Sequence, residues 1–108
     1  MDKNSVKKIK YGKKPVHKYL RSGHYHVVVN EYDDKFVSVG LTSDNPNNKR
    51  NQQLHKVYES NGKIARMKRS ATVDSKSFYK KKKADFHIDE ESEKKAIIIG
   101  NNKMAKKK

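Results

Sequence analysis

Two short apolar runs separated by a three-residue turn constrain the fold of this chain more than any other feature. The runs cover residues 25–32 and 36–42, and the turn is Asp33-Asp34-Lys35. Both runs are rich in valine and aromatic residues, which favour the half-buried surface of a β-sheet. In the second run, apolar residues alternate with small ones, as in a strand with one buried face. The sequence therefore predicts a β-hairpin at the centre of the fold.

The length and composition limit the classes of protein to which the chain can belong. A chain of 108 residues suits one small domain. It has no cysteine, so we expect neither a disulfide framework nor a thiolate metal site. No run reaches the length of a membrane span, and no apolar signal region follows the first lysines. We therefore expect a cytoplasmic protein that does not bind membranes and uses no metal or cofactor.

Positive charge is concentrated towards the two ends of the chain. The net charge is +15, from 27 basic and 12 acidic residues. Residues 1–22 hold 8 basic and 1 acidic side chains and residues 76–108 hold 11 and 5, whereas residues 23–75 hold 8 and 6. Basic flanks attract polyanions by releasing counterions. This distribution predicts RNA or a ribonucleoprotein as the partner. The alternative is that lysine-rich ends only keep a small protein in solution.

The rest of the chain is predicted to form further short elements. The polar stretch 43–53 is typical of a long loop. Asn61-Gly62 predicts a second hairpin, whose second arm continues to Val73. Phe86–Ile88 is expected to be an edge strand. The stretch Asp89–Gly100 predicts a short helix, with its first residue as the N-cap and its glycine just beyond the C-terminal end.

Together these elements predict a mainly β fold. We expect a small, SH3-like, strongly bent β-barrel with one short C-terminal helix and basic flexible tails. The expected organisation is a basic N-terminal arm over residues 1–15, a single barrel domain over residues 16–100 and a basic C-terminal tail over residues 101–108.

The order of these motifs resembles a known family. A valine-rich strand at His24–Val29 is followed by a strand end at Gly40–Ser43, a later strand at Lys68–Asp74 and an acidic helix start at Asp89–Glu91. Across residues 23–99 this order resembles the MazF/PemK family of toxin endoribonucleases, whose fold is an SH3-like barrel with a C-terminal helix. The resemblance implies metal-independent cleavage of RNA through its 2′-hydroxyl. It also implies a homodimer and an antitoxin as partners.

The candidate catalytic residues follow from this resemblance and from one departure. The family's catalytic arginine before the valine strand is absent, because Tyr25 and His26 stand at its Arg-Pro positions, whereas Thr42 matches the family's threonine. RNA cleavage needs a base and an acid, which two histidines can supply near neutral pH. His24 and His26 are two residues apart and would face the same side of a strand. We therefore predict His24, His26 and Thr42 as catalytic, unless the histidines are ordinary surface residues.

The candidate nucleic-acid contacts are cations of the long loop, of the second hairpin and of the lysine run before Phe86. These residues are Lys49, Arg50, Arg66, Lys68, Arg69, Lys80, Lys81, Lys82 and Lys83. On a regular strand, Arg66 and Lys68 would share one face and Arg69 would occupy the other. Nearby Tyr58 and Tyr79 would add base stacking to phosphate contacts. The alternative is a solvated charged face.

Two functions from different classes remain open at this point. The first is an RNA-binding protein of the MazF/PemK type that acts as a metal-independent endoribonuclease toxin. The second is a non-catalytic inhibitor encoded by a mobile genetic element, for example an anti-CRISPR protein acting on a Cas effector ribonucleoprotein. The missing arginine favours the second function, whereas Thr42 and the paired histidines favour the first. An accessory DNA-binding protein is a third, weaker alternative.

Overall fold

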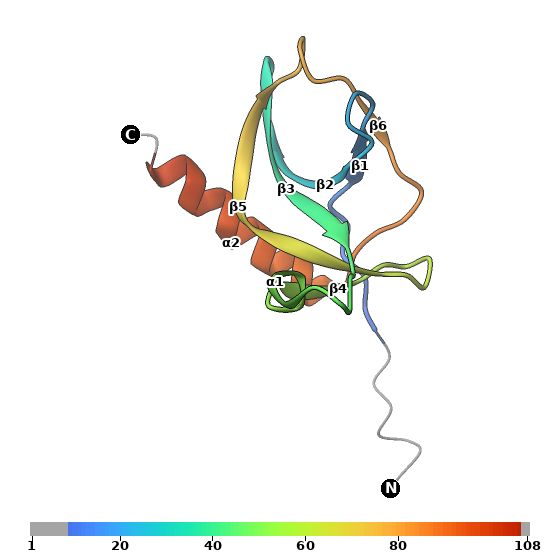
Figure 1. Cartoon of the computed structure of the whole chain (residues 1–108). Coiled ribbons are helices and arrows are strands. Elements are labelled where there is room, and N and C mark those ends of the chain that lie inside the picture. The colour runs from blue at the N-terminus through green and yellow to red at the C-terminus, as the bar shows by residue number, and fades with distance from the viewer. Residues whose placement is uncertain (1–8, 107–108) are drawn as a thin grey trace, which may run out of the picture.

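The computed structural model describes residues 9–106, which form one antiparallel sheet and a long C-terminal helix (Figure 1). The strands are β1 (Val16–Tyr19), β2 (Tyr25–Glu31), β3 (Lys35–Ser43), β4 (His55–Tyr58), β5 (Ile64–Ser75) and β6 (Lys81–Lys83). The helices are α1 (Lys49–Gln52) and α2 (Glu90–Lys106). The strand order in the sheet is β4-β5-β3-β2-β1-β6. The predicted mainly β fold with a C-terminal helix is confirmed.

The sheet is strongly bent, but it is not closed into the predicted barrel. Its pairing shifts between Val28 and Asn30 and again between Val39 and Leu41. Such irregularities bend and twist a strand. Among the described residues, β4 and β6 remain the two edges, with no pairing between them. The segment after β6 forms two isolated bridges, Ile88 with Glu59 and Asp89 with Tyr11, but no strand, so Phe86–Ile88 is not the edge strand that the sequence predicted.

The main core lies between the sheet and α2. The predicted central hairpin is confirmed, because β2 pairs with β3 and Val27 lies opposite Val39. Buried side chains on this side of the sheet include Val27, Val37, Val39 and Met67, and α2 contributes Ala96. Figure 1 shows α2 passing along β5 on the side away from the β5–β6 connection. Burial of these apolar side chains fixes the helix against the sheet.

The helix starts where the sequence predicts and ends later. Asp89 is the N-cap, since its Oδ2 accepts a hydrogen bond of 3.1 Å from the backbone nitrogen of Ser92. The helix was expected to stop at Gly100, yet it continues to Lys106. A Cβ at Gly100 would lie 2.6 Å from Val29 Cγ2. The glycine therefore permits close packing inside the helix and does not terminate it. Most of the predicted C-terminal tail is helical, and residues 107–108 lie outside the described residues.

Part of the expected N-terminal arm contacts the domain. The backbone nitrogen of Gly12 donates to the carbonyl of Ile88 at 2.8 Å, and that of Lys14 donates to Glu93 Oε2 at 2.7 Å. Tyr11 forms an isolated bridge with Asp89. Residues 9–15 are therefore held beside the start of α2. Residues 1–8 of the predicted arm lie outside the described residues.

A second, smaller cluster occupies the face of the sheet opposite α2. It contains Tyr19, Val28 and Phe36, and Tyr79 from the β5–β6 connection packs against it. Both faces of the central strands are therefore covered. None of the helices in the described part of the chain is both long and apolar enough to cross a membrane.

Candidate functional site

A pocket of about 300 Å³ forms where the start of β2 meets the end of β3. The pairing of Tyr25 with Leu41 brings these strands together, and the hairpin between β4 and β5 closes one side. Four segments line it: Gly23, His24 and Tyr25; Leu41, Thr42 and Ser43; Glu59, Asn61, Lys63, Ile64 and Ala65; and Phe86. This His24 pocket thus contains two of the three predicted catalytic residues, His24 and Thr42.

The turn before β2 places His24 at the pocket. Gly23 has a φ of 78°, a left-handed conformation that glycine adopts readily. The backbone nitrogen of His24 lies 3.2 Å from Ser22 Oγ, to which it donates, and its carbonyl accepts from the nitrogen of Tyr19 at 2.8 Å. These contacts fix the backbone, while the His24 side chain remains exposed. An exposed imidazole beside a pocket can exchange protons with a ligand.

Glu59 adds a carboxyl group that the sequence analysis missed. The residue is only 9% exposed, and burial raises the pKa of its carboxyl group, although Asn61 and Lys63 partly oppose this. A carboxyl group with a raised pKa beside a lysine is a candidate for general acid–base chemistry. No sequence signal identifies it, because a glutamate two residues before Asn61-Gly62 usually lies on a solvated turn. Its burial arises from the bridge to Ile88, which is distant in sequence.

His26, the third predicted catalytic residue, is not part of this pocket. Its ring stacks on Tyr19 with centroids 3.9 Å apart, and its Nδ1 lies 3.1 Å from Ser38 Oγ. Burial, helped by the charges of Lys68 and His24, lowers the pKa of His26 to about 4 against the opposing effect of Asp74. The expected pairing with His24 fails because His24 precedes β2, where strand alternation does not apply.

The surroundings of His26 form a polar network on the face opposite α2. Tyr19 Oη donates to Asp74 Oδ2 at 2.5 Å and lies 3.0 Å from Ser38 Oγ. Thr72 Oγ1 donates to the same carboxylate oxygen at 3.0 Å. Burial and the hydrogen bond to Asp74 raise the pKa of Tyr19. Ser38 is fully buried, so its hydroxyl is not accessible as a nucleophile. The network stabilises the sheet by satisfying buried polar groups.

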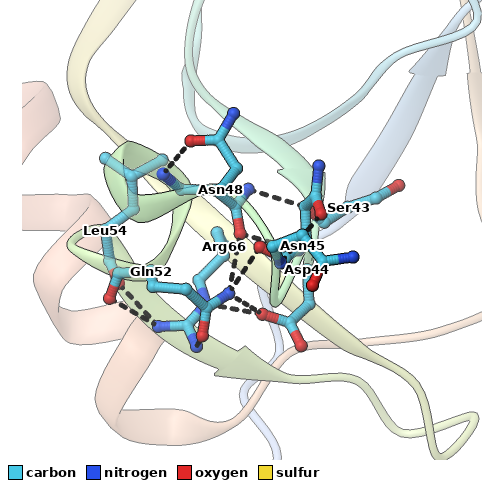
Figure 2. A network of polar contacts seen from close by, with 9 residues as sticks. Ser43, Asp44, Asn45, Asn48, Gln52, Leu54 and Arg66 are labelled. Atoms are coloured by element: carbon cyan, nitrogen blue, oxygen red, sulfur yellow. Dashed lines mark hydrogen bonds and ion pairs between the residues drawn. The ribbon is translucent and has the colours of Figure 1, made fainter.

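Arg66, predicted to contact nucleic acid, is instead the centre of an internal network (Figure 2). The residue is only 8% exposed. Its Nε donates to Asp44 Oδ1 at 2.9 Å, its Nη1 to the carbonyl of Leu54 at 3.0 Å and its Nη2 to Gln52 Oε1 at 2.9 Å. Hydrogen bonds from Gln52 and then from Arg66 lower the pKa of Asp44. The guanidinium group holds the loop between β3 and β4, so we exclude Arg66 from the candidate RNA surface.

The other predicted cations occupy different parts of the surface. Lys49 and Arg50 are exposed on α1, which interrupts the predicted loop. Lys68 and Arg69 are both exposed on β5. The Cδ of Lys68 lies beside Gly40 and His26, whereas Arg69 donates to the carbonyl of Gln53 and lies near Lys95 of α2, which agrees with the expected opposite faces.

The lysine run consists of Lys80 and the three residues of β6, and these lysines have different environments. Lys80 is exposed. The Nζ of Lys81 lies 4.8 Å from the Phe36 ring centroid and 3.3 Å from Glu31 Oε2, so this lysine has partners within the chain.

A lysine-lined pocket lies beside the His24 pocket. It has a volume of about 500 Å³ and is lined by Lys18, Leu20, Tyr25, Lys82, Lys83, Ala84 and Asp85. We call it the lysine groove. Tyr25 lines both this groove and the His24 pocket. The two sites are therefore adjacent, and a polyanion lying in the groove would be directed towards His24.

An exposed aromatic side chain stands close to the turn that carries His24. Phe78 is 59% exposed, and the guanidinium carbon of Arg21 lies 5.4 Å from its ring centroid. The backbone nitrogen of Leu20 donates to the carbonyl of Lys80 at 3.0 Å, which holds this turn beside the start of β6. Phe78 thus presents an exposed ring. Of the two tyrosines that the sequence suggested for stacking, Tyr79 packs against the smaller core cluster, whereas Tyr58 is exposed.

Comparisons of this chain with protein-family models, curated proteins and solved structures returned no match. We therefore infer the function from the geometry of the His24 pocket, the lysine groove and the exposed Phe78 ring.

Proposed function

We propose that this protein binds single-stranded RNA and cleaves it in the His24 pocket without a metal ion. The observation that carries the proposal is the convergence of His24, Thr42, Glu59 and Lys63 in one pocket. These residues come from three separate segments of the chain. Together they supply two groups able to exchange protons, one cation and one hydroxyl donor, which are the requirements of metal-independent RNA cleavage.

In the proposed reaction the 2′-oxygen of RNA attacks the adjacent phosphorus atom. Glu59 accepts the proton of the 2′-hydroxyl, and His24 in its protonated form donates a proton to the departing 5′-oxygen. The bond from phosphorus to the 5′-oxygen breaks, which leaves a 2′,3′-cyclic phosphate and a free 5′-hydroxyl. Lys63 and Thr42 stabilise the additional negative charge on the phosphoryl oxygens. The raised pKa of Glu59 makes it a stronger base than an ordinary carboxylate.

The neighbouring surfaces support RNA as the substrate. The lysine groove adjoins the pocket through Tyr25 and could hold phosphates on one side of the cleaved bond. Phe78, covered in part by Arg21, provides a ring on which an unpaired base could stack. The resemblance of the sequence to the MazF/PemK family points to the same reaction. In this proposal Lys63 supplies the positive charge that the family's missing arginine would have provided.

The test is incubation of the purified protein with a long single-stranded RNA in EDTA. We expect discrete fragments ending in cyclic phosphate, and a loss of about 100-fold or more in cleavage rate for His24→Ala and for Glu59→Gln. His26→Phe is the matched control, because it removes a histidine two residues away that lies outside the pocket and keeps a ring beside Tyr19. Equal loss of activity in His26→Phe and His24→Ala, with both proteins folded by circular dichroism, would contradict the assignment.

A second candidate function is favoured by the absence of the arginine before the valine strand. Tyr25 and His26 stand at those positions, and the His26 ring is held against Tyr19. RNA that stays intact in the cleavage experiment but is retarded on a gel would support the non-catalytic alternative. The protein would then be an inhibitor that engages a ribonucleoprotein, such as a Cas effector, through the same basic surface.

A further inference from the structure

A second basic pocket lies between α2, β5 and the segment before β4. Its volume is about 340 Å³, and its lining residues are Gln53, His55, Met67, Lys68, Arg69, Lys95 and Ile99. We call it the cation pocket. It shares no lining residue with the His24 pocket or with the lysine groove. It is therefore a separate site, not an extension of the one already described.

The cation pocket brings together two positive charges, those of Arg69 and Lys95, without a carboxylate in its lining. Lys68 also lines the pocket, but its Cδ lies beside Gly40 and His26, on the other face of the sheet. Arg69 and Lys95 form no ion pair with any residue between positions 9 and 106. Arg69 makes one long contact of 3.4 Å, from Nη2 to the carbonyl of Gln53, which leaves its other N–H groups available. Like charges brought together repel one another. An arrangement of this kind is stabilised when an anion enters.

His55 responds to this positive environment. Its Nε2 lies 2.9 Å from Ser92 Oγ, and burial followed by the charge of Lys95 lowers the pKa of its ring. Of the other charged groups that face His55, Asp89 and Glu91 raise the pKa of its ring, and Arg66 lowers it. An anion that binds beside Lys95 should therefore raise the pKa of His55, which can be measured.

We propose that the cation pocket binds a phosphate group through Arg69 and Lys95. The arginine can donate two parallel hydrogen bonds to phosphate oxygens, and the lysine adds a point charge. Resting on the proposed function, we assign this group to the backbone of bound RNA, at a nucleotide away from the cleaved bond. The pocket then acts as an anchor that positions RNA and takes no part in the bond-breaking step.

The first test uses pyrophosphate alone and is independent of RNA. In nuclear magnetic resonance titrations of the full chain, pyrophosphate should shift the Arg69 side-chain signal and raise the pKa of His55. Lys95→Gln should abolish both changes. Lys94→Gln is the matched control, because it removes the same charge from the neighbouring exposed residue, which does not line the pocket. Absence of the shifts in the wild-type protein, or their persistence in Lys95→Gln, overturns the phosphate site.

The second test measures RNA binding against salt concentration, in the His24→Ala background so that RNA remains intact. Each phosphate contact contributes about 0.7 to the slope of log affinity against log salt for a single strand. We expect Lys95→Gln to make the slope shallower by about 0.7 and Lys94→Gln to leave it unchanged. An unchanged slope in Lys95→Gln, together with pyrophosphate binding in the wild type, overturns the assignment to RNA. If Lys95→Gln makes the slope shallower but the protein with an intact His24 does not cleave RNA, the RNA anchor is supported and only the proposed cleavage is contradicted.

Discussion

Gly100 of α2 lies so close to Val29 of β2 that a Cβ on the glycine would stand 2.6 Å from Val29 Cγ2. Val29 is a buried, β-branched residue with little freedom to move away. At this point α2 can approach β2 so closely only because residue 100 has no side chain. The expected effect of adding a side chain here is therefore opposite to the effect of helix propensity.

We predict that Gly100→Ala destabilises the protein. On propensity alone, the substitution should stabilise a helix interior by about 1 kcal/mol. Overpacking against Val29 should cost more, so we expect a net loss of about 1 to 2 kcal/mol in the free energy of unfolding. In a Val29→Ala background the same substitution should be stabilising. Urea unfolding of the four proteins measures the coupling, and additive effects would contradict the packing argument.

Replacement of Arg66 should destabilise the domain and release its loop. Arg66→Met removes the hydrogen bonds to Asp44, Gln52 and Leu54. We expect a loss of about 2 to 3 kcal/mol, the range for hydrogen bonds made by a charged group at a buried position. Hydrogen exchange should rise across residues 43–54 and stay slow in β2. Arg69→Met, on the same strand but exposed, should change stability by less than about 0.5 kcal/mol.

The central hairpin and the helix N-cap were predictable because their signals are local. The alternation in Phe36–Leu41 and the position of Asp89 before three acids specify a strand and a helix start without reference to the rest of the chain. The end of the helix was not predictable in the same way. Gly100 is a common C-terminal signal, but here its reason is contact with Val29, which lies 71 positions earlier in the sequence.

The candidate site was predictable only in part, for the same physical reason. His24 and Thr42 were identified through the resemblance of short motifs, and the pairing of β2 with β3 brings them together. Glu59 was missed and Arg66 was misjudged because both are placed by partners from other segments, Ile88 and Asp44. A charged residue in a polar stretch gives no sign of such a partner. Composition and periodicity alone therefore cannot distinguish a buried, paired cation from one that is free to bind RNA.

Lowering the pH should destabilise the protein through His26. Its pKa is about 4 in the folded state and near 6.5 in the unfolded chain, so the unfolded state binds more protons between these values. The contribution of His26 is therefore fully present above about pH 6.5 and is lost as the pH falls to about 4. Because the ring is only partly buried, we expect a loss of about 2 kcal/mol, less than the full pKa shift would give.

His26→Phe isolates this effect. The phenylalanine keeps a ring on Tyr19 but cannot take up a proton, and it loses the contact with Ser38. We expect lower stability at pH 7 by about 1 kcal/mol and a weaker dependence on pH between 4 and 6.5. His17 and His55, whose pKa values are also lowered by burial, remain in both proteins, so the difference belongs to His26. Parallel stability curves for the two proteins would refute the interpretation.

Phe78 should contribute to RNA binding without contributing to stability. Its ring is 59% exposed and has Arg21 over one side, so truncation removes a stacking surface and little buried area. We expect Phe78→Ala to weaken the binding of single-stranded RNA by about 1 to 3 kcal/mol while the unfolding midpoint stays the same. Tyr32→Ala is the matched control. It removes an exposed aromatic ring that also faces a cation, Lys35, but lies on the β2–β3 turn. Equal binding losses in both variants would mean that any exposed ring serves the RNA, and the position of Phe78 beside the turn that carries His24 would then have no role in recognition.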